Sequence, residues 1–250
     1  MDAMQPNAIS TNLAKLKRVC IVGNSYIGAV KKAYSTKPSG DDDFDLFFFA
    51  SAGTFFQNIN ILDGVLVNIY QGDDSSRRIV DYDITVVYGD FPTPRQVFLF
   101  ANEARENIYS DQLRRARLEN WFMKFCSYRL CLSLVELNGP RVFMLSRNYN
   151  ISETILPQIE YDEGSTIIRE HLASVTYVQA PHSLFSSSGQ IQEIYYSKSL
   201  NVFGEEPDRN EQPKHHHNHL NEAGGRLVLT AILDSITEHV LSGRRAEGIE

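Results

Sequence analysis

The stretch RVCIVGNSYIG (residues 18–28) decides the fold that we expect for this chain. Residues 18–22 are mostly apolar and β-branched on both faces, which is typical of a strand buried in a parallel sheet between helical layers. Gly23-Asn24-Ser25 follows at once, and the residues after it fit a short helix that ends at the Pro38-Ser39-Gly40 turn. Strand, tight turn and helix in this order indicate an α/β protein.

The same alternation of strands and helices continues along the chain. Leu62–Tyr70 is interpreted as an extended stretch or a hairpin arm. Further strands, each ending in small or polar residues, are predicted at Phe44–Ala50, Asp83–Tyr88, Arg141–Ser146 and Val175–Gln179, and helices at Asp111 to about Leu137, Ser165–Leu172 and Glu222 to about Val240. This order predicts a three-layer α/β/α sandwich with a mostly parallel central sheet. Ligands of such sheets gather beyond the carboxyl ends of the strands.

Composition favours a single globular domain. The chain has 250 residues, of which 42% are hydrophobic, so disorder, a collagen-like repeat and a disulfide scaffold are excluded as descriptions of the whole. No linker interrupts the pattern, and we expect one α/β domain over residues 17–243, with a loose lead-in (1–16) and a short tail (244–250).

The charge balance argues against polyanionic partners. Lys and Arg number 24, Asp and Glu 31, and the net charge is −7, which disfavours nucleic acid and anionic membranes. The longest apolar run, Leu46–Ala50, is far shorter than the roughly 20 residues of a membrane span. No Walker or dinucleotide-binding motif is present, so no cofactor is expected.

Cysteine usage and the amino terminus predict the compartment. The chain has three cysteines, an odd number, and Cys20 falls within an apolar strand, so a disulfide framework is not indicated. The polar first 17 residues contain no signal-peptide-like apolar stretch. We therefore expect a cytoplasmic protein.

Ser25 is the first residue that could carry chemistry. A serine between a buried strand and a helix lies on a sharp turn at the carboxyl edge of the sheet, where the helix N-terminus supplies free N–H groups and a positive dipole end. This is the geometry of a nucleophilic serine on a strand–turn–helix elbow. The alternative is a serine that only caps the helix.

The second feature is a histidine-rich segment before the last helix. Lys214-His215-His216-His217-Asn218-His219 contains four of the seven histidines and leads to Asn221, which is a predicted helix cap. One of these histidines could be the base that deprotonates Ser25. The alternatives are a metal site, which lacks nearby Cys or carboxylate ligands, and a purification tag, which is disfavoured because the run is internal.

Taken together, these features resemble the SGNH (GDSL-like) hydrolase superfamily of esterases, lipases and carbohydrate acyl-hydrolases, whose sandwich is flavodoxin-like. Gly23-Asn24-Ser25-Tyr26 stands where the superfamily has Gly-Asp-Ser-Leu, which implies that Ser25 is the nucleophile and that Asn24 and Tyr26 lie in the pocket. His219 occupies the position of the superfamily's catalytic histidine, which implies that it is the base. Gly53 occupies the position of the superfamily's oxyanion-hole glycine, and Gly89-Asp90 occupies the position of its Gly-x-Asn-Asp block. The resemblance therefore implies that Ser25, Gly53 and Asp90 form the oxyanion hole.

Two positions depart from the superfamily pattern. His216 occupies the position of the aspartate that orients the catalytic histidine, and an imidazole cannot supply that negative charge. Asp208, Glu211 or a main-chain carbonyl is the substitute that we consider. Asp90 occupies the position of an asparagine that donates to the oxyanion, and loss of such a donor costs about 10²–10³ in rate.

The resemblance implies a serine-dependent esterase or acyltransferase acting on an O-acyl ester, with acetyl expected as the acyl group. The expected partner is an acylated small molecule or carbohydrate, with neither nucleic acid nor a membrane span involved, and a homo-oligomer is left open. The alternative is a catalytically silent protein of the same fold that binds glycans or serves as a scaffold in a polysaccharide or glycosyltransferase pathway.

Overall fold

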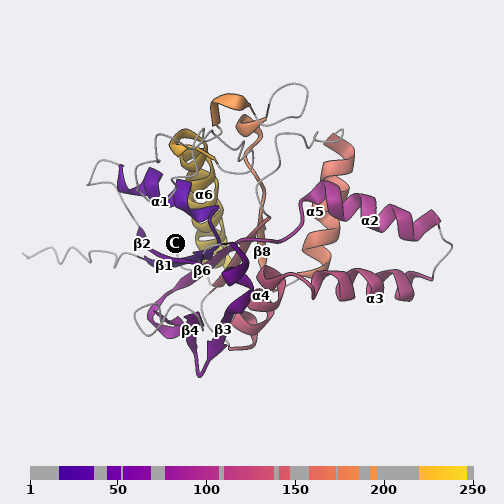
Figure 1. Ribbon diagram of the computed structural model, residues 1–250, viewed down its shortest axis with the longest axis horizontal. Coiled ribbons are helices and arrows are strands. Elements are labelled where there is room, and N and C mark those ends of the chain that lie inside the picture. The colour runs from indigo at the N-terminus through magenta and orange to yellow at the C-terminus, as the bar shows by residue number, and fades with distance from the viewer. Residues whose placement is uncertain are drawn as a thin grey trace, which may run out of the picture.

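Five parallel strands form the central sheet, in the order β2-β1-β6-β7-β8. They are β1 (Lys17–Gly23), β2 (Phe44–Ala50), β6 (Ile84–Tyr88), β7 (Arg141–Leu145) and β8 (Thr176–Val178), shown in Figure 1. The computed structural model describes residues 17–36, 44–51, 53–68, 77–106, 110–137, 141–146, 158–172, 174–185, 192–195 and 220–246. All five strands coincide with predicted ones to within a residue or two, because each is an apolar run with turn residues at its end.

Helices cover both faces of this sheet. Val19 and Ile21 of β1 point into a cluster with α1 (Ile27–Ser35) and α6 (Glu222–Ala246). Cys20 and Val22 point to the opposite face, into a cluster with α4 and other helices. The helices that contribute to this second cluster are α2 (Pro94–Glu106), α3 (Asp111–Phe122), α4 (Cys126–Glu136) and α5 (Gln158–His171). The three-layer α/β/α sandwich is therefore confirmed.

The strand order fixes where a ligand site belongs. The chain leaves β1 toward β2 on one side of it, and returns to β6 on the other side. This reversal is a topological switch point, and open α/β sheets bind ligands in the crevice beyond the strand ends at that point. The turn after β1 and the loop after β6 are the two segments that meet there.

The helix predicted from Asp111 to Leu137 is in fact two helices. α3 ends at Phe122, and α4 begins at Cys126 after Phe125, whose backbone is extended (φ −94°, ψ 130°). Helical spacing of apolar residues continues across the break, which is why the sequence pattern did not reveal it. α3 starts at Asp111 as predicted, and its N-cap is Ser110, whose side chain accepts a hydrogen bond from Leu113 N at 3.3 Å.

The sequence analysis missed α2, which follows the loop after β6. Its start is a capping box: Gln96 N donates to Thr93 Oγ1 at 3.4 Å, and Thr93 N donates to Gln96 Oε1 at 3.1 Å. Pro94 stands at the first helical position, where its missing N–H costs nothing. The signal was therefore present in the sequence as Thr93-Pro94-Arg95-Gln96, although no helix was predicted there.

A second, antiparallel sheet lies apart from the central one and was not predicted. It consists of β3 (Ile59–Leu62), β4 (Val65–Asn68) and β5 (Arg77–Arg78). Asp63 and Gly64 both have positive φ, 50° and 75°, as a two-residue hairpin turn requires. The stretch expected at Leu62–Tyr70 is thus a hairpin that begins at Ile59, and its last two residues lie outside the described ones.

Two helix boundaries also shift. α5 begins at Gln158 rather than Ser165, and α6 continues to Ala246, beyond residue 243 where we expected the domain to end. Among the described helices, none is both long and apolar enough to cross a membrane.

Close packing of α1 against α6 depends on the absence of a side chain at Gly225. A Cβ atom there would lie 2.3 Å from Ala29 O, which is backbone and cannot move aside. Gly225→Ala should therefore lower the free energy of unfolding by about 1–2 kcal/mol, because overpacking outweighs the gain in helix propensity. Urea unfolding measures this. Thr230→Ala, at an exposed position of the same helix, is the control and should raise the free energy of unfolding slightly, by up to about 0.7 kcal/mol, because it gains helix propensity without a clash. A stabilised Gly225→Ala protein would contradict the packing described.

Candidate active site

The residues after β1 form a tight elbow into α1. Asn24 Oδ1 accepts a hydrogen bond from Tyr26 N at 3.0 Å, and Asn24 O accepts one from Ile27 N at 3.2 Å. Ser25 O accepts one from Gly28 N at 3.2 Å. These three bonds hold Asn24, Ser25 and Tyr26 in a fixed turn at the carboxyl edge of the sheet.

Gly23 is required where the elbow begins. A Cβ atom at this position would lie 2.1 Å from Tyr88 O and 2.5 Å from Ile27 Cγ2. β1 can therefore approach the end of β6 and turn at once into α1 only because residue 23 has no side chain. This explains why the elbow carries glycine at its first position.

Ser25 does not cap α1. The N-cap of α1 is Tyr26, with helical backbone angles and no side-chain hydrogen bond at the cap. Within the described part of the chain, no hydrogen bond involves the Ser25 hydroxyl, and the residue is half-buried. The capping interpretation is therefore wrong, and the hydroxyl is left available for another role.

The end of β2 lies next to the elbow. Ser51 N donates to Gly23 O at 2.9 Å, which continues the pairing of β1 and β2 past the last strand residue. The buried Asn68 side chain donates to Ser51 Oγ at 2.6 Å and ties the hairpin to this corner. Gly53 begins a short 3-10 helix, η1 (Gly53–Asn58), two residues farther along. The oxyanion role of Gly53 N–H stays a prediction.

Asp90, after β6, is committed to the start of α4. Its carboxylate accepts hydrogen bonds from Cys126 N at 3.0 Å, Ser127 N at 2.9 Å and Ser127 Oγ at 2.8 Å. A carboxylate at a helix N-terminus satisfies otherwise unpaired N–H groups and complements the helix dipole. The role of Asp90 in the oxyanion hole also stays a prediction.

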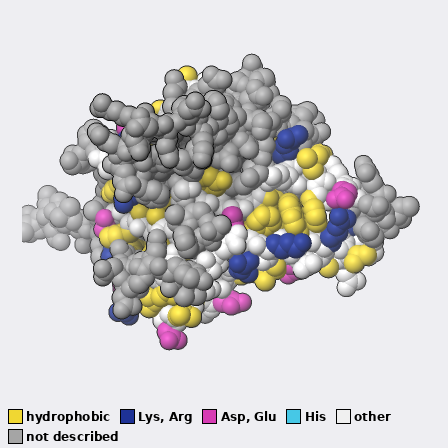
Figure 2. Space-filling model, viewed as in Figure 1, with side chains coloured by type: hydrophobic (Ala, Val, Ile, Leu, Met, Phe, Trp, Pro, Cys, Tyr) yellow, Lys and Arg dark blue, Asp and Glu magenta, His cyan; other side chains and the backbone are white. Residues whose placement is uncertain are grey.

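An open cleft of about 770 Å³ lies beside the elbow. It is lined by both chain neighbours of Ser25, by the end of β6 and by side chains of α2, α3 and the segment after α3: Asn24, Tyr26, Asp90, Gln96, Leu99, Phe100, Glu103, Trp121 and Phe125. Figure 2 shows hydrophobic side chains gathered between α2 and α3, bordered by Lys and Arg side chains. The sequence analysis placed Asn24, Tyr26 and Asp90 at a pocket but missed its helical wall.

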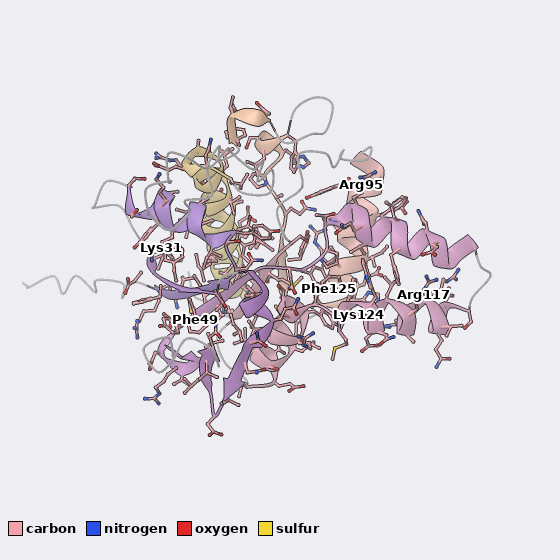
Figure 3. The ribbon with its side chains drawn as sticks, in the orientation of Figure 1. Lys31, Phe49, Arg95, Arg117, Lys124 and Phe125 are labelled. Carbon is pink, nitrogen blue, oxygen red and sulfur yellow. The ribbon has the colours of Figure 1, made fainter. Side chains whose placement is uncertain are left out.

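The wall of this cleft is an aromatic stack. The Phe100 and Trp121 rings are stacked with centroids 4.2 Å apart and planes at 12°, and Phe125 meets Trp121 edge to face at 5.5 Å. The Arg117 guanidinium lies 4.7 Å from the centre of the Phe100 ring and is bonded to Glu103 Oε2 at 3.1 Å. Figure 3 labels Arg95 on α2, Arg117 on α3, and Lys124 and Phe125 in the segment that follows α3.

The predicted base and its partners, His216, His219 and Asp208, lie outside the described residues, and so does the rest of the histidine-rich segment. Their roles therefore stay predictions. Of the described residues, no group of three or more His, Cys, Asp or Glu side chains is arranged to hold a metal ion.

The start of α6 is well defined. Asn221 caps it as predicted, accepting a hydrogen bond from Gly224 N at 3.0 Å. Leu220, the residue that follows His219 in the chain, is buried in the same cluster as Ile27 of α1. Thr36 Oγ1, at the end of α1, donates to Glu222 Oε1 at 2.8 Å, and this bond holds the pKa of that carboxyl below its usual range. The last helix is therefore tied to the helix that follows the elbow.

The three cysteines are free and buried, and for Cys20 burial was predicted from its place in an apolar strand. Cys126 donates its thiol to Phe56 O at 3.2 Å. Burial, with a smaller contribution from Asp90, raises the pKa of this thiol to about 12. Since the thiolate is the reactive form, Cys126 is not a nucleophile at neutral pH although it lies close to the strand ends.

Comparisons with known proteins add the following. No protein-family model and no curated protein matches the chain. Among solved structures, the acetyl xylan esterase AlAXEase is similar over 88% of this chain and 99% of its own, at 14% identity and a TM-score of 0.41. The salicylyl-acyltransferase SsfX3 from a tetracycline biosynthetic pathway is similar over 90% of this chain and 55% of its own, at 12% identity and a TM-score of 0.39. At these identities and TM-scores the similarities assign no role to any residue, so the function of the site is inferred from the residues of this chain alone.

Replacement of Asp90 should destabilise the fold. Asp90→Ala leaves two N–H groups at the start of α4 without an acceptor, and we expect the free energy of unfolding to fall by roughly 2–4 kcal/mol. Asp90→Asn keeps one acceptor oxygen and should cost less. The control is Asp111→Ala, because that side chain is 93% exposed and pairs only at the surface with Arg114. Equal stability of the Asp90→Ala and Asp111→Ala proteins in urea would show that the cap is unimportant.

Alkaline pH should destabilise the protein partly through Cys126. The folded pKa is about 12 and the ordinary value is 9.0, so between these values the unfolded chain loses a proton that the folded chain keeps. Stability from this group is therefore complete below pH 9 and is lost as pH rises toward 12. Cys126→Ser retains a donor toward Phe56 O but removes the titration. Between pH 8 and 10.5, the free energy of unfolding measured in urea should fall less steeply with pH in this variant than in the unmodified protein. Equal slopes of free energy against pH would contradict the raised pKa of Cys126.

Proposed function

We propose that this protein is a serine-dependent esterase or acyltransferase of the SGNH type that acts on an O-acyl ester of a carbohydrate. The observation that carries the proposal is the elbow. At the switch point of a parallel sheet, a half-buried serine precedes a helix, and its hydroxyl has no hydrogen-bond partner in the described part of the chain. A serine hydroxyl held in this way suits nucleophilic attack better than it suits a structural role.

In the proposed mechanism, His219 takes the proton from Ser25 Oγ, which attacks the ester carbonyl and forms an acyl-enzyme. The alcohol leaves with the proton held by His219. Water then hydrolyses the acyl-enzyme, or a second hydroxyl compound accepts the acyl group. The nine-residue helix α1 begins directly after the elbow, and its positive N-terminal end favours the developing oxyanion.

The oxyanion is proposed to rest on backbone donors. Ser25 and Gly53 follow the ends of the adjacent strands β1 and β2, and in this proposal their N–H groups donate to the carbonyl oxygen. Asp90 already accepts three hydrogen bonds, so in this proposal it shapes the site through α4 and does not bind the oxyanion directly. His219 is oriented by Asp208 or by a main-chain carbonyl, because His216 offers no negative charge.

Ser25→Ala tests the proposal. We expect turnover of 4-nitrophenyl esters and labelling by a fluorophosphonate to fall by at least about 10³-fold, while the melting temperature stays nearly unchanged because the hydroxyl makes no bond within the described part of the chain. Ser35→Ala is a matched control, since this exposed serine of α1 bonds only to Lys32 O. His219→Ala should lose activity similarly, and His182→Ala, at an exposed histidine, should not.

The opposite result would favour the silent alternative. If the unmodified protein neither hydrolyses esters nor reacts with the fluorophosphonate, yet binds glycans as well as Ser25→Ala does, the enzyme proposal fails. The missing donor at Asp90 and the missing carboxylate at His216 would then be the reason.

A further inference from the structure

We propose that the cleft beside the elbow binds the acyl chain of the substrate, and that the preferred acyl group is a medium-length alkyl chain rather than acetyl. The inference rests on the proposed role of Ser25, since it names which part of an ester the cleft receives. It also replaces the acetyl group that the sequence led us to expect.

The position of the cleft connects it to the elbow. Asn24 and Tyr26, which flank Ser25, line one end, and Asp90 after β6 lines the same end. The opposite wall is formed by α2, α3 and Phe125. Ser25 itself is not one of the lining residues, so the cleft reaches the elbow through the two chain neighbours of Ser25, and in this proposal an acyl group attached to Ser25 extends past them into the cleft. The volume of about 770 Å³ falls in the range of roughly 300–1,000 Å³ seen for ligand pockets, whereas an acetyl group has only two carbons.

The wall offers alkyl surface and ring edges rather than free ring faces. Phe100 is stacked on Trp121, and the Arg117 guanidinium also lies over the Phe100 ring. Phe125 is set edge to face with Trp121, with the two ring planes at 85°. A sugar ring needs an open aromatic face for stacking, and these faces are largely used within the protein. Leu99 is 49% exposed on the same wall, so it offers apolar surface to an occupant of the cleft.

Charge in the cleft is already paired. The charged residues among its described lining are Asp90 and Glu103. Asp90 is held by the first N–H groups of α4, and Glu103 is bonded to Arg117. The described lining therefore offers no positively charged side chain to an anion, and a neutral alkyl chain is the occupant that fits its chemistry.

Burial of an alkyl chain has a measurable signature. Each methylene removed from water contributes about 0.8 kcal/mol, which corresponds to roughly a fourfold change in affinity. With the whole chain inside the cleft, kcat/KM for 4-nitrophenyl esters should rise about fourfold per methylene from acetate to hexanoate or octanoate, until the cleft is full. A flat series, or one that falls from acetate onward while remaining dependent on Ser25, would overturn the inference and leave the proposed function intact.

Leu99→Ala locates the effect in the cleft. Loss of this half-exposed side chain should lower the octanoate-to-acetate ratio of kcat/KM by about fivefold, since part of the chain's apolar contact is removed. Leu113→Ala is the matched control, because Leu113 is 51% exposed on α3 but does not line the cleft. This control should keep both the ratio and the rates. Equal ratios in the two variants would place the chain elsewhere.

Direct binding tests the inference without catalysis. Trp121 is the only tryptophan of the chain and lies in the cleft wall, so its fluorescence reports occupancy. The probes are 2-alkanones from acetone to 2-nonanone, titrated into the Ser25→Ala protein. We expect the dissociation constant to fall about fourfold per methylene. Binding that does not depend on chain length would overturn the inference, whereas chain-dependent binding without any esterase activity would retain the cleft and reject only the proposed function.

Discussion

The absence of a side chain at Gly23 is the constraint on which the rest of the structure depends. At this residue β1 passes so close to Tyr88 O that a Cβ atom would lie 2.1 Å from it, while Gly23 O accepts a hydrogen bond from Ser51 N on the other side. The end of β1 is thereby joined to the ends of both neighbouring strands. The turn that follows is held at the middle of the sheet edge, and α1 must start immediately, which places Ser25 at the switch point.

The Asp90 carboxylate makes a second connection, between the end of β6 and the start of α4. It extends from the end of β6 and binds the first N–H groups of α4, so the helical segment expected from Asp111 to Leu137 breaks at Phe125. Because of this break, α3 leaves the sheet and pairs with α2 through the Phe100–Trp121 stack, with Phe125 at its base. In Figure 1 this helical pair extends away from the sheet. The cleft is the space between the pair and the elbow.

Different residues at the edge of the sheet therefore stabilise the fold and are available for catalysis. Asp90 and Cys126, the groups with the most obvious acid–base character near the strand ends, are engaged in hydrogen bonds to α4 and η1. Burial keeps the Cys126 thiol protonated, so its pKa excludes it as a nucleophile. Ser25 makes no such bond among the described residues, and its two neighbours open onto a cleft with an apolar wall. This division is what makes Ser25 the candidate for chemistry and the aromatic wall the candidate for substrate binding.

Local sequence by itself determined the strands of the central sheet, the elbow and the cap of the last helix, whereas the order of the strands came from the tertiary structure. Buried parallel strands are continuous apolar runs, the elbow needs glycine, and Asn221 bonds to a residue only three positions away, so each signal lies within a few residues. The break at Phe125, the attachment of the hairpin to the end of β2 and the cleft were decided only by the tertiary structure. Asp90 lies 36 residues before Cys126, and Phe100 meets Trp121 from another helix. Such pairings depend on how the elements dock, because the free energy that fixes them comes from contacts between distant segments and not from the propensity of either segment alone.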